Sequence, residues 1–293
     1  MALRKDPLRI AIHVVVYVVL YFVTAAIFGR PLLWLLDYLA GITATGLLAA
    51  LFANWLALRI YENRRLVELG LWWNRSSGEN LALGLLGGAG SACLVLAPPL
   101  VARVARFAPT PAEGPGWDTF LFLTILLAAG AAGEELFFRG YGFQILLATL
   151  GPYATIVPVG VIFALLHGAN PNITGLAMAN TAVFGIVFGY AYLRSRDLWL
   201  PIGLHFGWNF TLPLFGANVS GLRMKETGYE LAWNAGPLWS GGAYGPEGSL
   251  LTSAVLVVLL LYLWKAPVRR QSSPLTGPPV ETVSCDPAPP LPS

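Results

Sequence analysis

Four strongly ionisable side chains stand alone in the long apolar stretch from Thr119 to Leu193: Glu134, Glu135, Arg139 and His167. The next apolar run adds His205 and Asn209. A charge in the interior of a bilayer costs roughly 3 kcal/mol on insertion scales. An apolar chain that keeps an acid pair, a base and two histidines is therefore expected to use them, and these residue types suit hydrolysis by an activated water molecule.

The two adjacent glutamates are predicted to have different roles. On a helix, Glu135 and Arg139 are one turn apart, at i and i+4, so that Arg139 can neutralise Glu135. Glu134 is rotated by about 100° from Glu135 and can face a water molecule, as a general base must. The structural alternative is a buried ion pair that only stabilises packing, but this alternative leaves the second glutamate without a role.

The two histidines are predicted to lie near the acid pair. Glu134 and His167 are each about 16 residues from a turn near 150–152, so two unbroken antiparallel helices would bring them to a similar depth. His205 and Asn209 share a helix face and could donate hydrogen bonds to an oxyanion, or His205 could bind a metal. The structural alternative for these side chains is hydrogen bonding between helices.

The composition predicts a polytopic membrane protein. Hydrophobic residues make up 56% of the chain and charged residues only 11%, against about 25% charged residues in soluble domains. Apolar segments that could span a bilayer lie at about 8–28, 38–60, 80–105, 117–148, 152–168, 173–193, 198–215 and 249–265. The predicted fold class is therefore all-α, with about eight transmembrane helices and a polar catalytic cavity inside the bundle.

Four regions are predicted along the chain. They are N-terminal transmembrane helices with a cytoplasmic interfacial segment (1–115), a catalytic transmembrane core (116–215), an extracytoplasmic loop with the last helix (216–266), and a disordered Pro-rich cytoplasmic tail (267–293). Basic residues gather before the first helix and after the last, so the positive-inside rule predicts that both termini are cytoplasmic. The compact length and the Ala-, Gly-, Leu- and Arg-rich composition suit a bacterial inner membrane.

Several functional classes are disfavoured. The net charge of +3 gives no indication of nucleic-acid binding. Cys93 and Cys285 are too far apart in sequence to suggest a disulfide framework or a cysteine-based metal site. The chain has no HExxH motif, no Gly-x-Ser-x-Gly nucleophile in an apolar segment and no pair of aspartates within apolar segments. These absences argue against the serine and aspartyl classes of intramembrane protease.

Three motifs in order resemble those of the CAAX protease and bacteriocin-processing (CPBP or Abi) family, the type II CAAX prenyl endopeptidases. They are Glu134-Glu135-x-x-x-Arg139, Phe163-x-x-x-His167 and His205-x-x-x-Asn209, and the resemblance covers about 117–215. It implies that Glu134, assisted by His167, activates the attacking water. It also implies that His205 and Asn209 stabilise the oxyanion, with Glu135 and Arg139 in support.

Two alternatives for the cofactor stay open. Glu134, His167 and His205 could form a three-ligand Zn²⁺ site with an open position for water. They could equally activate a water molecule without any cofactor.

The function predicted on this basis is intramembrane endopeptidase activity. The expected partners are the lipid bilayer and a peptide or membrane-anchored protein substrate, such as a prenylated C-terminus or a bacteriocin leader. The alternative is a non-proteolytic scaffold, immunity factor or regulator of the same fold. A transporter with a proton relay is disfavoured, because the chain shows no internal repeat.

Overall fold

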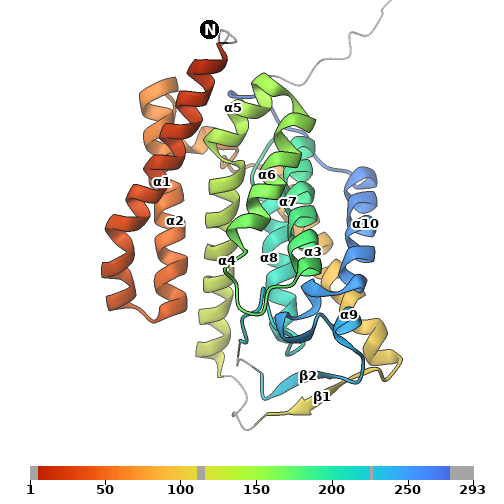
Figure 1. The fold of residues 1–293 in the computed structure, drawn as a ribbon. Helices are drawn as coiled ribbons and strands as arrows, with labels where there is room; N and C mark the ends of the chain where they lie inside the picture. The colour runs from red at the N-terminus through yellow and green to blue at the C-terminus, as the bar shows by residue number, and fades with distance from the viewer. Residues whose placement is uncertain (1–5, 111–115, 225–226, 278–293) are drawn as a thin grey trace, which may run out of the picture.

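The computed structural model describes residues 6–110, 116–224 and 227–277, and these residues are mostly helical (Figure 1). Every predicted apolar segment contains a helix. The main helices are α1 (Pro7–Leu35), α2 (Tyr38–Ala57), α3 (Arg75–Val101), α4 (Trp117–Arg139), α5 (Tyr141–Leu150), α6 (Pro152–Leu166), α7 (Gly175–Ser195), α8 (Trp199–Leu214) and α10 (Leu250–Lys265). Short helical turns are η1 (Leu58–Glu62), η2 (Leu66–Leu69), α9 (Pro237–Ser240), η3 (Gly242–Tyr244) and η4 (Pro246–Gly248).

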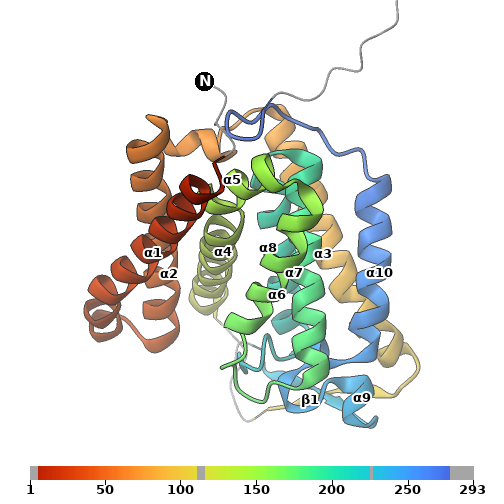
Figure 2. The ribbon, with the colours of Figure 1, turned by 45° about the horizontal axis from the view of Figure 1, so that its top comes forward.

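The helices form one bundle with a hairpin at its side. Figures 1 and 2 show α1 and α2 as an antiparallel pair beside α4, with the other long helices on the far side of α4. Helix α1 begins and α10 ends at the same end of the bundle, which we call the terminal end. The opposite end carries strands β1 (Ala105–Pro109) and β2 (Tyr229–Trp233), and we call it the sheet end.

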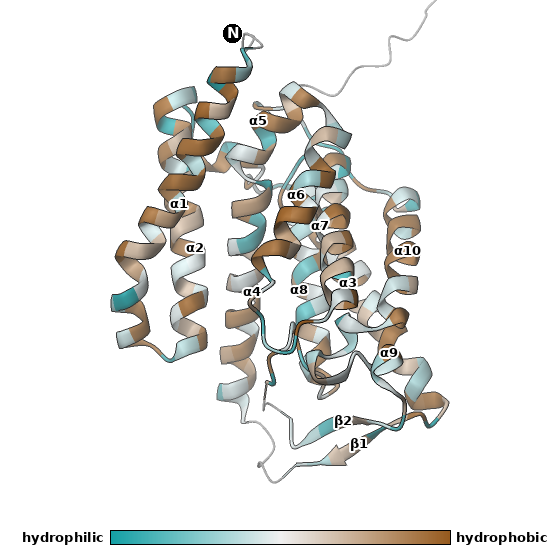
Figure 3. Ribbon diagram, viewed as in Figure 1, coloured by the Kyte–Doolittle hydropathy of each residue, from teal (hydrophilic) through white to brown (hydrophobic). Residues whose placement is uncertain are grey.

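Five helical segments in the described residues are long and apolar enough to cross a membrane. They are Pro7–Leu35, Tyr38–Glu62, Arg75–Val101, Trp117–Leu150 and Gly175–Ser195. Helices α6 and α10 are apolar but shorter. Large apolar side chains along α1, such as Val19 and Phe22, are half exposed, and the helices are mainly hydrophobic in Figure 3. This outer surface suits contact with lipid rather than with water.

The fourth predicted helix is divided at Gly140. A Cβ atom at this position would overlap the carbonyl oxygen of Leu136, so the bend requires glycine. Asn54 of α2 satisfies the backbone groups that the bend exposes. Its Oδ1 accepts a hydrogen bond from the Tyr141 N–H at 2.7 Å, and its Nδ2 donates to the Leu136 oxygen at 2.9 Å. Asn54 therefore stabilises the break between α4 and α5 and connects α2 to the end of α4.

Helix α8 packs closely against α3 through glycines. Gly84 of α3 lies against Gly203 of α8, and Gly88 and Gly207 each lie against the backbone of the other helix. A Cβ atom at Gly207 would lie only 2.7 Å from the carbonyl oxygen of Leu85 in α3. Small residues allow two helix backbones to approach in this way. This contact fixes the side of α8 that faces away from α4.

The all-α prediction is wrong in one detail, because the sheet end carries an antiparallel pair of strands. Strands β1 and β2 pair with Ala105 opposite Trp233. The third helix, expected to reach 105, ends at Val101, shortly after Pro98 and Pro99, and Arg103 adopts a left-handed backbone conformation. Proline cannot donate a helical hydrogen bond, which favours the end of the helix here. The pairing also joins the predicted regions 1–115 and 216–266.

The start of the predicted disordered tail is ordered. Gln271 accepts a hydrogen bond from the Trp72 indole at 2.7 Å and donates to Asp197, and Leu275 is buried against the core. Residues up to 277 therefore pack across the terminal end of the bundle. The remainder of the predicted tail, 278–293, lies outside the described residues.

Candidate active site

The six predicted site residues come from two helices and one helix end. Glu134, Glu135 and Arg139 lie on the last two turns of α4, and His205 and Asn209 lie on α8. His167 is the residue that ends α6. The expectation of two unbroken helices between Glu134 and His167 is wrong, because of the bend at Gly140. The two residues nevertheless meet, since α5 carries the chain over the end of α4 before α6 returns (Figure 1).

Glu135 and Arg139 form the predicted ion pair, with both side chains fully buried. The Arg139 Nη1 donates to Glu135 Oε1 at 3.2 Å. Its Nη2 donates to the Gly185 carbonyl oxygen of α7 at 2.6 Å. The rings of Phe163 and Phe188 lie 5.2 and 5.4 Å from the guanidinium carbon, which adds cation–π stabilisation. A planar guanidinium with several donors suits this crowded position.

His205 is oriented by the same carboxylate. Its Nδ1 lies 3.0 Å from Glu135 Oε1, and its ring stacks on Phe188 with the centroids 4.8 Å apart. An ionised carboxylate can only accept a hydrogen bond, so Nδ1 carries the proton in this contact. The Nε2 atom then faces Glu134, with 3.9 Å between Nε2 and Oε2. Glu135 thus sets both the tautomer and the direction of His205.

His167 presents the same ring nitrogen to Glu134. Its Nδ1 lies 2.7 Å from the Phe163 carbonyl oxygen, which can only accept, so Nδ1 again carries the proton. Its Nε2 lies 3.6 Å from Glu134 Oε2. Two imidazoles therefore converge on one carboxylate oxygen, at distances longer than direct hydrogen bonds. Polar contacts of this length are typical of groups that share a water molecule.

Glu134 differs from Glu135 in its exposure. Its side chain is 40% exposed, whereas that of Glu135 is fully buried. Within the described residues, Glu134 Oε2 is buried without a hydrogen-bond partner. The exposed part borders a groove of about 480 Å³ between α1, α2 and α4. Glu134 is therefore the acid of the pair that a substrate can reach.

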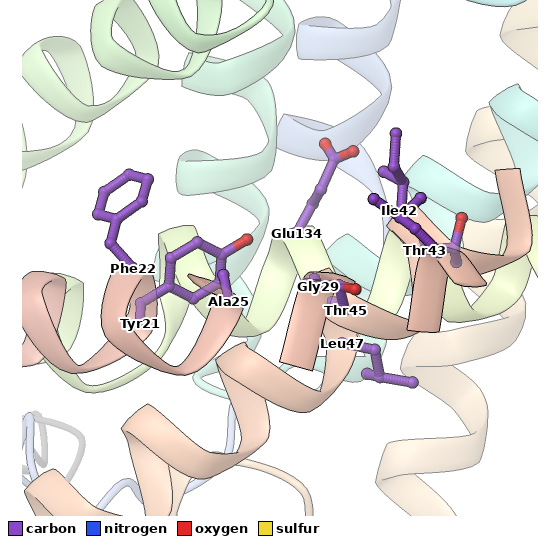
Figure 4. Close-up of a pocket in the computed structure, with 13 residues that line it drawn as sticks. Tyr21, Phe22, Ala25, Gly29, Ile42, Thr43, Thr45, Leu47 and Glu134 are labelled. Carbon is purple, nitrogen blue, oxygen red and sulfur yellow. The ribbon is translucent and has the colours of Figure 1, made fainter. Parts of the chain in front are cut away.

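The groove itself is mainly apolar. Figure 4 shows Tyr21 and Phe22 of α1 on one side of Glu134, and Ile42 and Thr43 of α2 on the other. Several of the residues that line the groove are glycines. One of them, Gly130, lies one helical turn before Glu134. The polar cavity predicted for the bundle is thus a buried polar cluster that meets an apolar groove at Glu134.

Asn209 lies one turn beyond His205 on α8 and is partly buried. Among the described residues, its side-chain amide has no hydrogen-bond partner. The amide can therefore donate to a ligand. The structure brings five predicted site residues into one contact network, and Asn209 is the residue that stands apart from it.

A metal site is not formed by the side chains as they lie. In the described part of the chain, no group of three or more His, Cys, Asp or Glu residues is arranged to hold a metal ion. Glu134, His167 and His205 converge, but they do not present a ready three-ligand Zn²⁺ site. The zinc alternative stays a prediction.

The family assignment follows from a comparison with known protein families. The model described as Rce1-like, type II CAAX prenyl endopeptidase, matches residues 116–211. These residues form an Rce1-like domain. The match confirms the resemblance drawn from the three motifs, and all six predicted site residues lie within it. In a comparison with curated proteins, nothing matches the chain.

Two further conclusions follow from the match to the Rce1-like family. Its family is one of polytopic membrane proteins, so the chain is an integral membrane protein with several candidate spans. The family also consists of CAAX-type endopeptidases, and the buried cluster of Glu134, Glu135 and His205 is consistent with a catalytic site.

Sequence reasoning missed three contributors to this cluster. Phe188 stacks on His205, Gly185 supplies the carbonyl oxygen that binds Arg139, and Tyr21 lines the groove next to Glu134. The first two lie in the middle of α7, where no charged residue stands beside them in the sequence. A carbonyl oxygen or an aromatic ring in an apolar helix carries no signal of its own in the sequence.

Proposed function

We propose that this protein is an intramembrane endopeptidase that hydrolyses a peptide bond in a membrane-associated protein or peptide. The observation that carries the proposal is the convergence of two imidazole Nε2 atoms on Glu134, at the edge of an apolar groove. A scaffold protein has no evident need for such a costly arrangement in an apolar bundle.

The proposed reaction begins with a water molecule beside Glu134. The Glu134 carboxylate takes a proton from this water while the oxygen attacks the carbonyl carbon of the peptide bond. His167, held at Nδ1 by the Phe163 carbonyl, orients the water through Nε2. The attack forms a tetrahedral intermediate with a negative oxygen, and no covalent bond to the enzyme is made.

The intermediate then has to be stabilised and broken down. Asn209 donates a hydrogen bond to the oxyanion, and His205 donates from Nε2 when it carries a proton there. Glu135 and Arg139 hold His205 in place without touching the substrate. The proton on Glu134 passes to the leaving amine as the carbon–nitrogen bond breaks, which returns the site to its starting state.

The groove supports an apolar substrate that approaches from the lipid. Phe22 and Ile42, which line the groove, are half exposed on the outer surface of the bundle. A peptide held near the membrane by an apolar side chain or a lipid anchor could enter beside Glu134 without crossing water. The distribution of Lys and Arg supports a topology with both termini in the cytoplasm. The compact length and the Ala-, Gly-, Leu- and Arg-rich composition support a location in a bacterial inner membrane.

The proposal is tested with purified protein in detergent and a library of quenched fluorescent, membrane-anchored peptides. We expect the wild type to cleave some peptides and Glu134→Gln to cleave none. Glu230→Gln, which changes an exposed carboxylate on β2, serves as the matched control and should behave as wild type. Equal cleavage by wild type and Glu134→Gln would rule out the proposed mechanism.

The alternative function is a non-proteolytic scaffold or regulator of the same fold. It predicts that a cellular phenotype of the deletion is restored by Glu134→Gln as well as by wild type. Under the endopeptidase proposal, only the wild type restores it.

A further inference from the structure

A buried carboxylate outside the three motifs contacts the catalytic helix α8. Glu247 lies in the turn η4, on the loop between β2 and α10, and only 7% of the residue is exposed. Its Oε1 accepts a hydrogen bond from the Trp208 indole N–H of α8 at 3.1 Å. Its Oε2 accepts the backbone N–H of Ser220. Both carboxylate oxygens are therefore occupied by donors from different parts of the chain.

The loop end that carries Glu247 is fixed to two other helices. Asn180 of α7 donates from Nδ2 to the carbonyl oxygens of Glu247 and Ser249, at 2.8 and 3.0 Å. The Ser253 hydroxyl of α10 donates to Asn180 Oδ1 at 2.7 Å. Because α7 and α10 hold its backbone in place, Glu247 is a well-positioned hydrogen-bond acceptor for a donor on α8.

Trp208 connects Glu247 to the catalytic cluster. It is 2% exposed and lies between His205 and Asn209 in sequence, three residues after the first and one before the second. Its ring packs edge-to-face on Phe184, at 4.7 Å between centroids. Phe184 packs on Phe188, which stacks on the His205 imidazole at 4.8 Å. A rotation of Trp208 therefore disturbs the ring against which His205 rests.

Besides the contact of His205 with Glu135, two contacts restrain the rotation of α8 about its own axis. The glycine contact with α3, at Gly203 and Gly207, holds one side of the helix. That contact is close packing of two backbones, which small residues allow, and the α3 atoms nearest to these two glycines are backbone atoms rather than hydrogen-bonding side chains. The directional hydrogen bond from Trp208 to Glu247 supplies the second contact, on a different side of α8.

The Glu247 carboxylate also lies close enough to the candidate active site to interact electrostatically with His167. Burial raises the pKa of Glu247, while the hydrogen bonds from Ser220 and Trp208, and more weakly the charge of His167, oppose this rise. A carboxylate suits this position for a second reason: it accepts at two oxygens, whereas a glutamine offers only one.

We propose that Glu247 is a positioning residue of the endopeptidase, which acts through Trp208 to hold α8 in the rotation that aims His205 and Asn209 at the reacting carbonyl group. This inference rests on the proposed function and adds a residue outside the matched segment 116–211. Glu247 does not touch the substrate groove, so it should affect turnover rather than peptide binding.

The test compares two single variants, their double variant and one control variant on a peptide that the wild type cleaves. Trp208→Phe removes the indole donor and keeps a ring against Phe184, while Glu247→Gln leaves one oxygen for two donors. We expect each to lower kcat roughly ten- to a hundredfold with KM within about twofold, since small misplacements of catalytic groups are costly. The double variant should lose little more than the worse single variant, because both act through one contact. Tyr262→Phe, which deletes the hydrogen bond from α10 to Leu83 of α3, is the matched control and should keep kcat.

Hydrogen exchange of the backbone amides of α8 gives a readout that needs no activity. Exchange over 199–214 should be faster in Trp208→Phe and Glu247→Gln than in wild type and Tyr262→Phe. Unchanged exchange in both variants would overturn the proposal. Faster exchange with unchanged kcat would also overturn it, because Glu247 would then stabilise α8 without positioning the catalytic residues. If wild type cleaves no peptide, the endopeptidase proposal fails, and the exchange data still decide whether Glu247 anchors α8. A variant that does not fold is recognised by thermal unfolding in detergent, and the other single variant then carries the test.

Discussion

His205 and Glu135 form the central contact of the candidate active site, with 3.0 Å between Nδ1 and Oε1. The same carboxylate oxygen accepts a hydrogen bond from Arg139, so one fully buried acid connects the arginine of its own helix to the histidine of α8. Glu134, its neighbour in sequence, remains partly exposed to the groove. The two adjacent acids therefore differ in burial and in contacts, and the proposed division into a structural and a chemical role can be tested.

The first prediction contrasts the stability of two isosteric variants. Glu135→Gln leaves the buried Arg139 without its negative partner and should lower the free energy of unfolding by about 3 kcal/mol, as expected when one member of a buried pair is removed. Glu134→Gln should leave stability nearly unchanged, because Glu134 has no direct hydrogen bond to lose. Thermal unfolding in detergent measures both. Equal stability of the two variants would contradict the structural role of Glu135.

The second prediction concerns the oxyanion. Asn209→Ala should lower kcat by roughly a hundred- to a thousandfold, the usual cost of one oxyanion donor, with little effect on KM or on folding. Kinetics on a cleavable peptide measures the change. Asn218→Ala, which alters an exposed amide at the sheet end, is the control. A change in KM alone would indicate that Asn209 binds the substrate instead.

The third prediction tests the groove as the path of the substrate. Gly130→Leu should fill the groove beside Glu134 without a clash, since the nearest atom to a Cβ at this position is 3.8 Å away. We expect KM to rise and protein stability to stay the same. Gly90→Leu is the matched control, because it adds the same side chain to open space on α3. If Gly130→Leu cleaves peptides as the wild type does, the substrate reaches Glu134 by another route.

The fourth prediction addresses the metal. Cleavage should survive treatment with a strong chelator, because the proposed reaction activates water with Glu134 and His167 and stabilises the oxyanion with Asn209 and His205. The measurement is turnover before and after chelation, with added Zn²⁺ as the second arm. Loss of activity that Zn²⁺ alone restores would instead support Glu134, His167 and His205 as ligands.

The fifth prediction is a pH dependence at the terminal end. Burial raises the pKa of Asp197, and hydrogen bonds from Asn80 and Gln271 only partly oppose this. The folded state therefore binds a proton more readily than the unfolded state. Stability from this group is present below the unfolded pKa and is lost as the pH rises through the folded value.

Asp197→Asn removes that titration. The stability of wild type relative to Asp197→Asn should therefore increase when the pH is lowered from about 7 to about 4. Unfolding temperatures of both proteins at the two pH values give the comparison. A relative stability that does not change with pH would show that Asp197 titrates alike in both states.

The sequence by itself determined most of the helices and the candidate residues of the site. Long apolar segments cannot satisfy their backbone groups in lipid except as helices, and each contains a helix, although the fourth is divided in two at Gly140. The spacing of Glu135 and Arg139 sets their contact, because one helical turn brings i and i+4 together. These relationships are local, so a pattern in the sequence suffices to find them.

Only the tertiary structure decided how the motifs meet. The contact of Glu135 with His205 joins residues of two helices, and the bend at Gly140 depends on Asn54, which lies on a third. The order along the chain does not specify such packing, because the rotation of each helix follows from the shapes of all its neighbours. For the same reason, Glu247 was invisible as a partner of α8: a loop glutamate has no periodic pattern, and its role appears only when the loop folds back onto Trp208.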